Sequence, residues 1–118
     1  MGKRNVKLVV KPWGYELIFA LTERYAGKIL FVKAGCRLSD QYHIVKNETL
    51  YLSSGLLAIL VTPPGEKCVG VYLREGEAIN FPPFCAHRIK ALVDSFIYEV
   101  STPELDDVVR LEDDYGRA

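Results

Sequence analysis

The sequence is divided into short apolar or alternating runs by turn residues, and this pattern constrains the fold more than any other feature. Glycine and proline lie between many of the runs, as in Ser53-Ser54-Gly55 and Pro63-Pro64-Gly65. The runs are Val6–Val10, Tyr15–Leu21, Lys28–Val32, Gln41–Val45, Thr49–Leu52, Leu56–Val61, Val69–Leu73, Ala78–Phe81, His87–Ala91 and Ser95–Val100. Regular short strands with such punctuation predict an all-β barrel or sandwich. Only Thr102–Asp107, with a capping threonine, a proline and early acids, predicts a short C-terminal helix or turn.

Length and charge limit the classes of function. The 118 residues suffice for one domain with one core, so we expect a single domain over 1–118. Fifteen basic and fifteen acidic residues cancel, which argues against a nucleic-acid partner. Leu56–Val61 is too short to cross a membrane, and the N-terminus lacks a signal-peptide core. Three unpatterned cysteines predict reduced thiols, and therefore a cytoplasmic protein.

Two histidines and a glutamate have the character of metal ligands. In an extended strand, Gln41, His43 and Val45 would point to the same face. Glu48 follows a predicted turn, and His87 opens a later strand. Two imidazoles and one carboxylate are a common ligand set for a divalent transition metal. The residue pattern alone leaves open that both histidines are ordinary hydrogen-bonded side chains.

Two segments resemble the conserved motifs of the cupin superfamily. Gly35 to Gly55 contains a glycine, a histidine, a glutamate and a glycine in the order of the first motif, and Gly76 to Ala91 follows the second. The flanking segments Lys11–Glu16 and Asp106–Arg117 resemble the C-terminal cupin domain of type II mannose-6-phosphate isomerases, which is often fused to a mannose-1-phosphate guanylyltransferase. The resemblance implies an antiparallel jelly-roll β-barrel and a homodimer.

The resemblance also implies a metal site. One divalent ion (zinc, manganese, iron or nickel) would be held by His43, Glu48 and His87, with Gln41 as a fourth and weaker ligand. The sequence departs from the family pattern at three positions, where Val45 replaces a histidine, Phe84 a glycine and Ala91 an asparagine. Phe84 stands where glycine tolerates backbone angles that phenylalanine resists. The alternative is a cupin that has lost its metal.

Other side chains near these motifs have weaker roles. Arg37 could anchor a phosphate or carboxylate, or form a salt bridge at the barrel mouth. Tyr98 is expected to line the pocket or the core, and Glu99, on the opposite face of its strand, to be solvated or at an interface. We expect Lys46 to be a solvated turn residue, and Cys85 to be a buried, inert thiol rather than a neighbour of the metal.

We consider three functions for such a domain. The first is a metal-dependent isomerase acting on a small sugar or sugar phosphate, although no side chain stands out as its catalytic base. The second is a non-catalytic sugar-binding or regulatory module. The third is an iron-dependent oxygenase, because two histidines and a carboxylate can hold iron(II).

Overall fold

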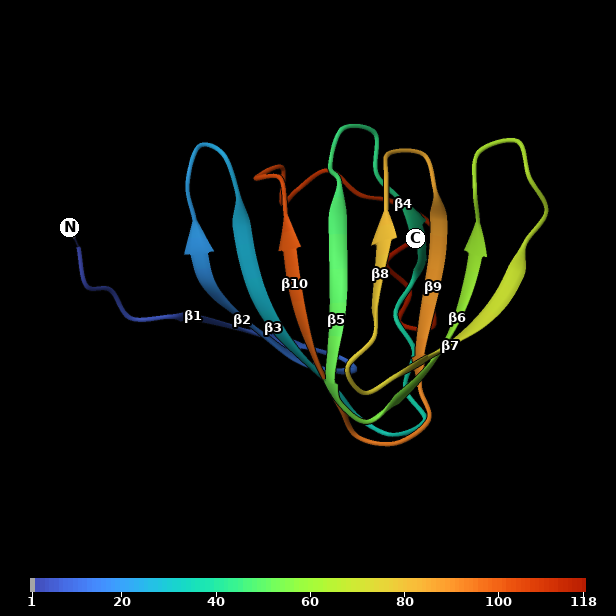
Figure 1. The fold of residues 1–118 in the computed structure, drawn as a ribbon, viewed down its shortest axis with the longest axis horizontal. Helices are drawn as coiled ribbons and strands as arrows, with labels where there is room; N and C mark the ends of the chain where they lie inside the picture. Colours follow the sequence, from blue (N-terminus) through green and yellow to red (C-terminus); the bar gives the residue numbers. More distant parts are fainter. Residues whose placement is uncertain (1) are drawn as a thin grey trace.

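The computed structural model describes residues 2–118 and consists of strands joined by turns and loops, with no helix in that range (Figure 1). Its strands form two antiparallel sheets, which we call sheet A and sheet B. In spatial order, sheet A contains β1 (Lys7–Lys11), β2 (Gly14–Leu21), β3 (Ala26–Val32), β10 (Ser95–Ser101), β5 (Glu48–Ser54) and β8 (Ala78–Phe81). Sheet B contains β11 (Val109–Glu112), β4 (Asp40–Tyr42), β9 (Ala86–Ala91), β6 (Leu56–Thr62) and β7 (Val69–Arg74).

The two sheets face each other around one core, which confirms the predicted all-β jelly-roll. Alternate residues of the facing strands supply the core, because successive side chains on a strand point to opposite faces. Leu52, Phe81 and Ile97 are completely buried, and Leu30 and Ile59 nearly so. No helix among residues 2–118 is long and apolar enough to cross a membrane.

The C-terminal segment has one of the two predicted conformations, followed by a strand that was not predicted. Of the two alternatives for Thr102–Asp107, the structure has the turn: backbone N–H groups of Leu105 and Asp107 donate to carbonyls only two or three residues back. A further strand, β11, follows and pairs with β4, so the segment crosses from sheet A to sheet B. In Figure 1 the C-terminus accordingly lies beside β4 and β9.

Along sheet A, the inner face changes from apolar to charged. Leu30 and Ile97 are paired across β3 and β10, and the next inward pair toward one end is Lys28 and Glu99. All four side chains are buried. Glu48, at the start of β5, extends the charged end of the same sheet. The charged groups therefore concentrate at one end of the barrel interior.

Candidate functional site

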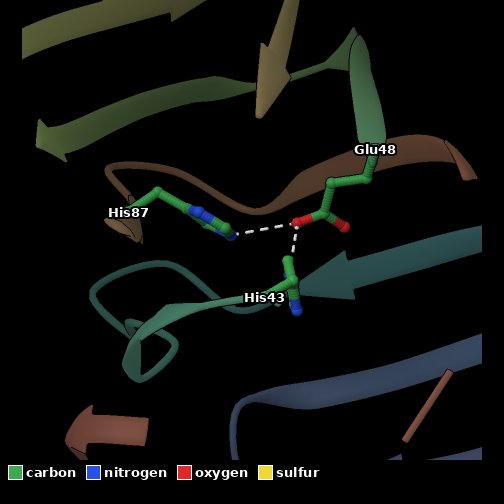
Figure 2. A group of neighbouring side chains, drawn as sticks. All are labelled: His43, Glu48 and His87. Atoms are coloured by element: carbon green, nitrogen blue, oxygen red, sulfur yellow. Dashed lines mark hydrogen bonds and ion pairs between the residues drawn. The ribbon is translucent and has the colours of Figure 1, made fainter. Parts of the chain in front are cut away.

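Three predicted ligands meet at this charged end (Figure 2). His43 immediately follows β4, Glu48 opens β5, and His87 lies on β9. The Nε2 atoms of His43 and His87 lie 2.9 and 3.0 Å from the same oxygen, Oε1 of Glu48. Each of the three side chains is at most 3% exposed. Residues far apart in the sequence thus converge on one buried point.

The hydrogen bonds of the two imidazoles fit them to a metal. Nδ1 of His43 contacts the backbone oxygen of Asp107, and Nδ1 of His87 lies 3.0 Å from that of Cys85. A carbonyl oxygen only accepts, so each Nδ1 must carry a proton, and in the neutral ring Nε2 is then a lone pair. Both lone pairs face a carboxylate oxygen, which is also an acceptor. These facing acceptors are compatible only if extra protons or a cation lie between them. Histidines that bind a metal commonly donate a hydrogen bond from their second ring nitrogen in this way.

The spacing of the donor atoms also fits a transition metal. Two ligands at about 2.1 Å from an ion, at a right angle, are separated by about 3 Å. The observed separations between Nε2 and Oε1 match this value. His87 is held in place by Phe81, whose ring stacks on the imidazole with centroids 3.9 Å apart. Each imidazole nitrogen therefore lies at the separation from Oε1 that two ligands of one ion would have, and the three donor atoms lie within 4.8 Å of one another.

Charge interactions set the protonation of these groups. Burial works against the charged form of Glu48, but hydrogen bonds from His43 and His87 and the charge of Lys46 hold its pKa well below the ordinary value. Burial likewise works against charged His43, yet Glu48 outweighs it and raises the pKa of His43. Glu48 is therefore a carboxylate at neutral pH, the form that binds a metal.

Lys46 and Glu99 form a buried ion pair beside the ligands, which corrects two expectations. Nζ of Lys46 lies 3.2 Å from Oε2 of both Glu48 and Glu99. Neither side chain is solvated, because Lys46 turns inward from its loop and Glu99 lies on the inner face of β10. Burial and the nearby charge of Glu48 raise the pKa of Glu99 to about 7.

The loop that carries His43 is held by Asp107. Its carboxylate accepts hydrogen bonds from the backbone N–H groups of Ile44, Val45 and Lys46. These bonds lower the pKa of Asp107. The backbone oxygen of Asp107 also accepts the hydrogen bond from Nδ1 of His43, so this one residue fixes both the loop and the imidazole ring.

A cavity of about 500 Å³ opens over this site. His43, Glu48, Lys46 and Glu99 line it, together with Gln41. Gln41 is paired with His87 across β4 and β9, and its Oε1 accepts a hydrogen bond of 2.6 Å from the buried Ser39 hydroxyl. The structure brings Gln41 to the same cavity as His43 and Glu48, whereas His87 does not line it, and the role of Gln41 as a fourth ligand stays a prediction.

Tyr98 and Val45 lie elsewhere than predicted, and Arg37 takes the second of its two predicted roles. Arg37 does not line the cavity: it forms two hydrogen bonds with Asp114, the salt bridge that was its alternative. Tyr98 points outward and stacks on Tyr51, so the expected orientation of β10 was wrong. Val45 does not share a face with His43, because β4 ends at Tyr42 and Val45 is exposed in the following loop.

Of two residues in the second motif, Phe84 adopts the backbone angle that it was expected to resist, and Cys85 is buried as expected. Phe84 has a φ of 64°, the only positive value of a non-glycine residue among residues 2–118, so this position does require the conformation that glycine favours. Cys85 is buried in the hydrophobic core, and burial raises the pKa of its thiol. This environment agrees with an inert thiol.

Three residues of the site were missed by sequence reasoning, namely Lys46, Glu99 and Asp107. A signal for Glu99 existed in β5: if Glu48 points inward, so do Leu50 and Leu52, while Tyr51 points outward. Tyr51 pairs with Tyr98, which places Glu99 on the inner face. Using that signal requires knowing that β5 and β10 are neighbours. Asp107 gave no such signal, because its contacts depend on a turn.

Sequence comparison finds relatives among larger proteins. The chain is 37% identical over 116 residues to the mannose-1-phosphate guanylyltransferase ManC of Salmonella typhimurium. It is 31% identical over 114 residues to the xanthan biosynthesis protein XanB of Xanthomonas campestris. Each alignment covers 92% of this chain but only 23% of the relative, so the chain spans about a quarter of their length. No family model matches the chain.

Solved structures share the fold at low sequence identity. The capsular polysaccharide assembling protein CapF of Staphylococcus aureus superposes with a TM-score of 0.76 at 21% identity, covering 93% of this chain and 35% of CapF. KdgF from Halomonas sp. superposes with a TM-score of 0.73 at 21% identity, covering 87% of this chain and 91% of KdgF. Oxalate decarboxylase of Bacillus subtilis superposes with a TM-score of 0.79 at 16% identity, covering 91% of this chain and 30% of the decarboxylase. These similarities support the jelly-roll architecture.

Proposed function

This chain is a cupin that resembles the C-terminal region of mannose-1-phosphate guanylyltransferases, and from that premise we propose that it binds one divalent transition metal and isomerises a small sugar or sugar phosphate. One observation carries the proposal: Nε2 of His43, Nε2 of His87 and Oε1 of Glu48 converge, while backbone carbonyls hold both Nδ1 atoms. Zinc, manganese, iron and nickel all suit such a ligand set.

The residues around the metal site would supply the proton transfer of an isomerase. A bound metal would polarise a carbonyl or hydroxyl of the sugar. Glu99 lines the same cavity, and its carboxylate contacts the Lys46 ammonium that also contacts Glu48, so we assign it as the base that moves a proton between adjacent carbons. Lys46 holds Glu99 and Glu48 in fixed positions through its ammonium group.

Metal content tests the first half of this proposal. Chelator-free protein, incubated in turn with zinc, manganese, iron(II) and nickel, should retain one ion per chain by elemental analysis. His87→Ala should abolish stoichiometric binding, and Gln41→Ala should weaken it. Glu66→Gln, at an exposed acid outside the cavity, is the control and should bind like wild type. A wild type that retains none of these metals would contradict the metal site.

Activity tests the second half. Metal-loaded protein should convert mannose 6-phosphate to fructose 6-phosphate, and Glu99→Gln should lose this activity while retaining the metal. Loss of the metal in that variant would show that Glu99 supports the site rather than the reaction. A second candidate is a non-catalytic sugar-binding module, because the carboxylate that would act as the base is held in a buried ion pair with Lys46. Saturable sugar binding without turnover by any metal form would identify that candidate.

We also propose that the protein acts as a homodimer in the cytoplasm. The strand β1 is an edge of sheet A, and its outward side chains Leu8 and Val10 are 58% and 78% exposed. An edge strand with apolar side chains is suited to pairing with another strand. Cys36, Cys68 and Cys85 are free thiols, as expected in a reducing compartment.

A further inference from the structure

A second cavity, of about 360 Å³, lies on the outer face of sheet B and shares no lining residue with the cavity over the candidate metal site. Its floor is formed by β9, β6 and β7, which are neighbours in that sheet (Figure 1). Leu57, Ile59 and Val61 of β6 point into the core, so the alternate residues Ala58 and Leu60 point outward. A ligand in this second cavity would therefore lie on the opposite side of the sheet from the candidate metal site.

One row of directly paired residues shapes the second cavity. Arg37 is opposite Lys90 on β9, and Lys90 is opposite Ala58 on β6. Ala58 is in turn opposite Tyr72 on β7, which is 64% exposed. Directly paired side chains project from the same face of a sheet. The row thus consists of two cations, a small residue and an exposed aromatic ring, and Ala58 leaves a gap between Lys90 and Tyr72.

The width of this gap fits a single ring. Neighbouring strands lie about 4.8 Å apart, so the backbones that carry Lys90 and Tyr72 are separated by about 10 Å. Leu60, which is 52% exposed, borders the gap on β6. Its Cδ2 atom lies 3.9 Å from the place that a Cβ atom on Gly70 would take, so it covers the glycine and adds an apolar wall. The gap therefore suits an apolar group no larger than one ring.

The charges around the gap leave one cation unbalanced. Three cationic side chains line the cavity, those of Arg37, Arg88 and Lys90. Asp114 accepts hydrogen bonds from both arginines, and Glu112 accepts a further one from Arg88. These two carboxylates balance the two arginines, whereas Lys90 forms no salt bridge within the described part of the chain. Like charges directly opposite each other on neighbouring strands are unfavourable, so an anion beside Lys90 and Arg37 would be stabilised.

We infer that this second cavity binds a small monoanion that carries an apolar ring, an aromatic carboxylate in its simplest form. The carboxylate would lie beside Lys90 and the Nη1 atom of Arg37, which donates no hydrogen bond to Asp114. The ring would lie over Ala58 and against Tyr72. One unbalanced positive charge matches a monoanion, and aromatic rings pack favourably against each other. The site goes beyond the proposed function, because it lies outside the barrel and takes a ligand other than a sugar.

Benzoate is the probe that tests this site. It is titrated into isotope-labelled, chelator-treated protein at constant ionic strength, and binding is followed by the NMR shifts of backbone amides. We expect saturable shifts at Ala58, Gly70 and Lys90. Acetate has the charge without the ring, and benzyl alcohol has the ring without the charge, so each should bind at least about tenfold more weakly. A benzoate titration that does not saturate, or equal binding of either analogue, would overturn the site.

Two variants test the charge and the gap separately. Lys90→Met should weaken benzoate binding about tenfold, because it removes the unbalanced charge. Ala58→Leu keeps every charge but fills the gap, and should abolish saturable binding. The controls Lys67→Met and Ala78→Leu make the same changes at exposed positions outside the cavity and should bind like wild type. Unchanged amide shifts away from β6 and β9 show that each variant is folded.

The same titrations separate this site from the metal proposal. Benzoate should bind equally with and without added zinc, so a protein that retains no metal would leave the site unaffected. Retained affinity in Ala58→Leu, or losses in the controls equal to those in the two test variants, would contradict the site whatever the metal content.

Discussion

At the scale of single residues, the rarity of histidine made the three residues of the candidate metal site predictable. The chain has only two histidines, and both reach the site together with the glutamate of the same motif. Lys46 and Glu99 were not predictable in this way, because lysine and glutamate are common and usually solvated. Their burial depends on which face of β10 points inward, and pairing with distant strands decides that.

Protons should compete with the metal for the imidazoles. A metal binds the neutral ring, and Glu48 raises the pKa of His43 above its ordinary value in the metal-free protein. Affinity should therefore fall as the pH decreases, and the fall should begin above the ordinary imidazole pKa of about 6.5. A competition titration with a chromogenic chelator at several pH values measures this. An affinity that is constant from about pH 8 to about pH 5 would exclude imidazole ligands.

Phe84 allows a test of backbone conformation at a single position. Its φ of 64° is accessible to asparagine but strained for a β-branched residue. Phe84→Asn and Phe84→Val both remove the ring that stacks on Tyr42, so they differ mainly in backbone strain. We expect Phe84→Val to unfold with a free energy lower by about 1 kcal/mol or more than Phe84→Asn. Thermal and urea unfolding of the two variants measure the difference, and equal stabilities would contradict the left-handed conformation.

At the scale of elements, the strands were predicted well and their connections were not. Alternation and turn residues place most strands of both sheets within a few residues. The strand predicted at Gln41–Val45 is too long. The Asp107 carboxylate accepts hydrogen bonds from the backbone N–H groups of residues 44–46, and β4 therefore ends at Tyr42. Such a long-range contact leaves no periodic signal in the sequence.

The same contact predicts that Asp107 supports metal binding without touching the metal. Asp107→Ala should loosen the loop of His43 and weaken metal affinity by about tenfold, the usual effect of losing a group that orients a ligand. The matched control is Asp106→Ala, which removes a neighbouring exposed carboxylate that also lines the cavity. Metal titrations of both variants separate the two explanations. If Asp106→Ala weakens binding equally, the effect is one of charge alone.

At the scale of the whole molecule, the edge strand β1 is the feature that a second copy would cover. Sedimentation at micromolar concentration should give about twice the chain mass of 13.3 kDa. Val10→Glu introduces a charge on the outward face of β1 and should yield monomers. Val69→Glu makes the same change on β7, an edge of sheet B, and should remain dimeric. A monomeric wild type would contradict the dimer.

The proposed metal site would also have a consequence for folding kinetics, because its three donors lie on or next to different strands. His43, Glu48 and His87 meet only when β4, β5 and β9 have taken their places in two separate sheets. In the unfolded chain, closing the loop between the histidines carries an entropic cost, so a metal ion gains little there. An ion at a hundred times its dissociation constant should stabilise the folded state by about 2.7 kcal/mol. We expect that gain to slow unfolding and leave the refolding rate unchanged, so that stopped-flow measurements would show the metal prolonging the lifetime of the folded chain.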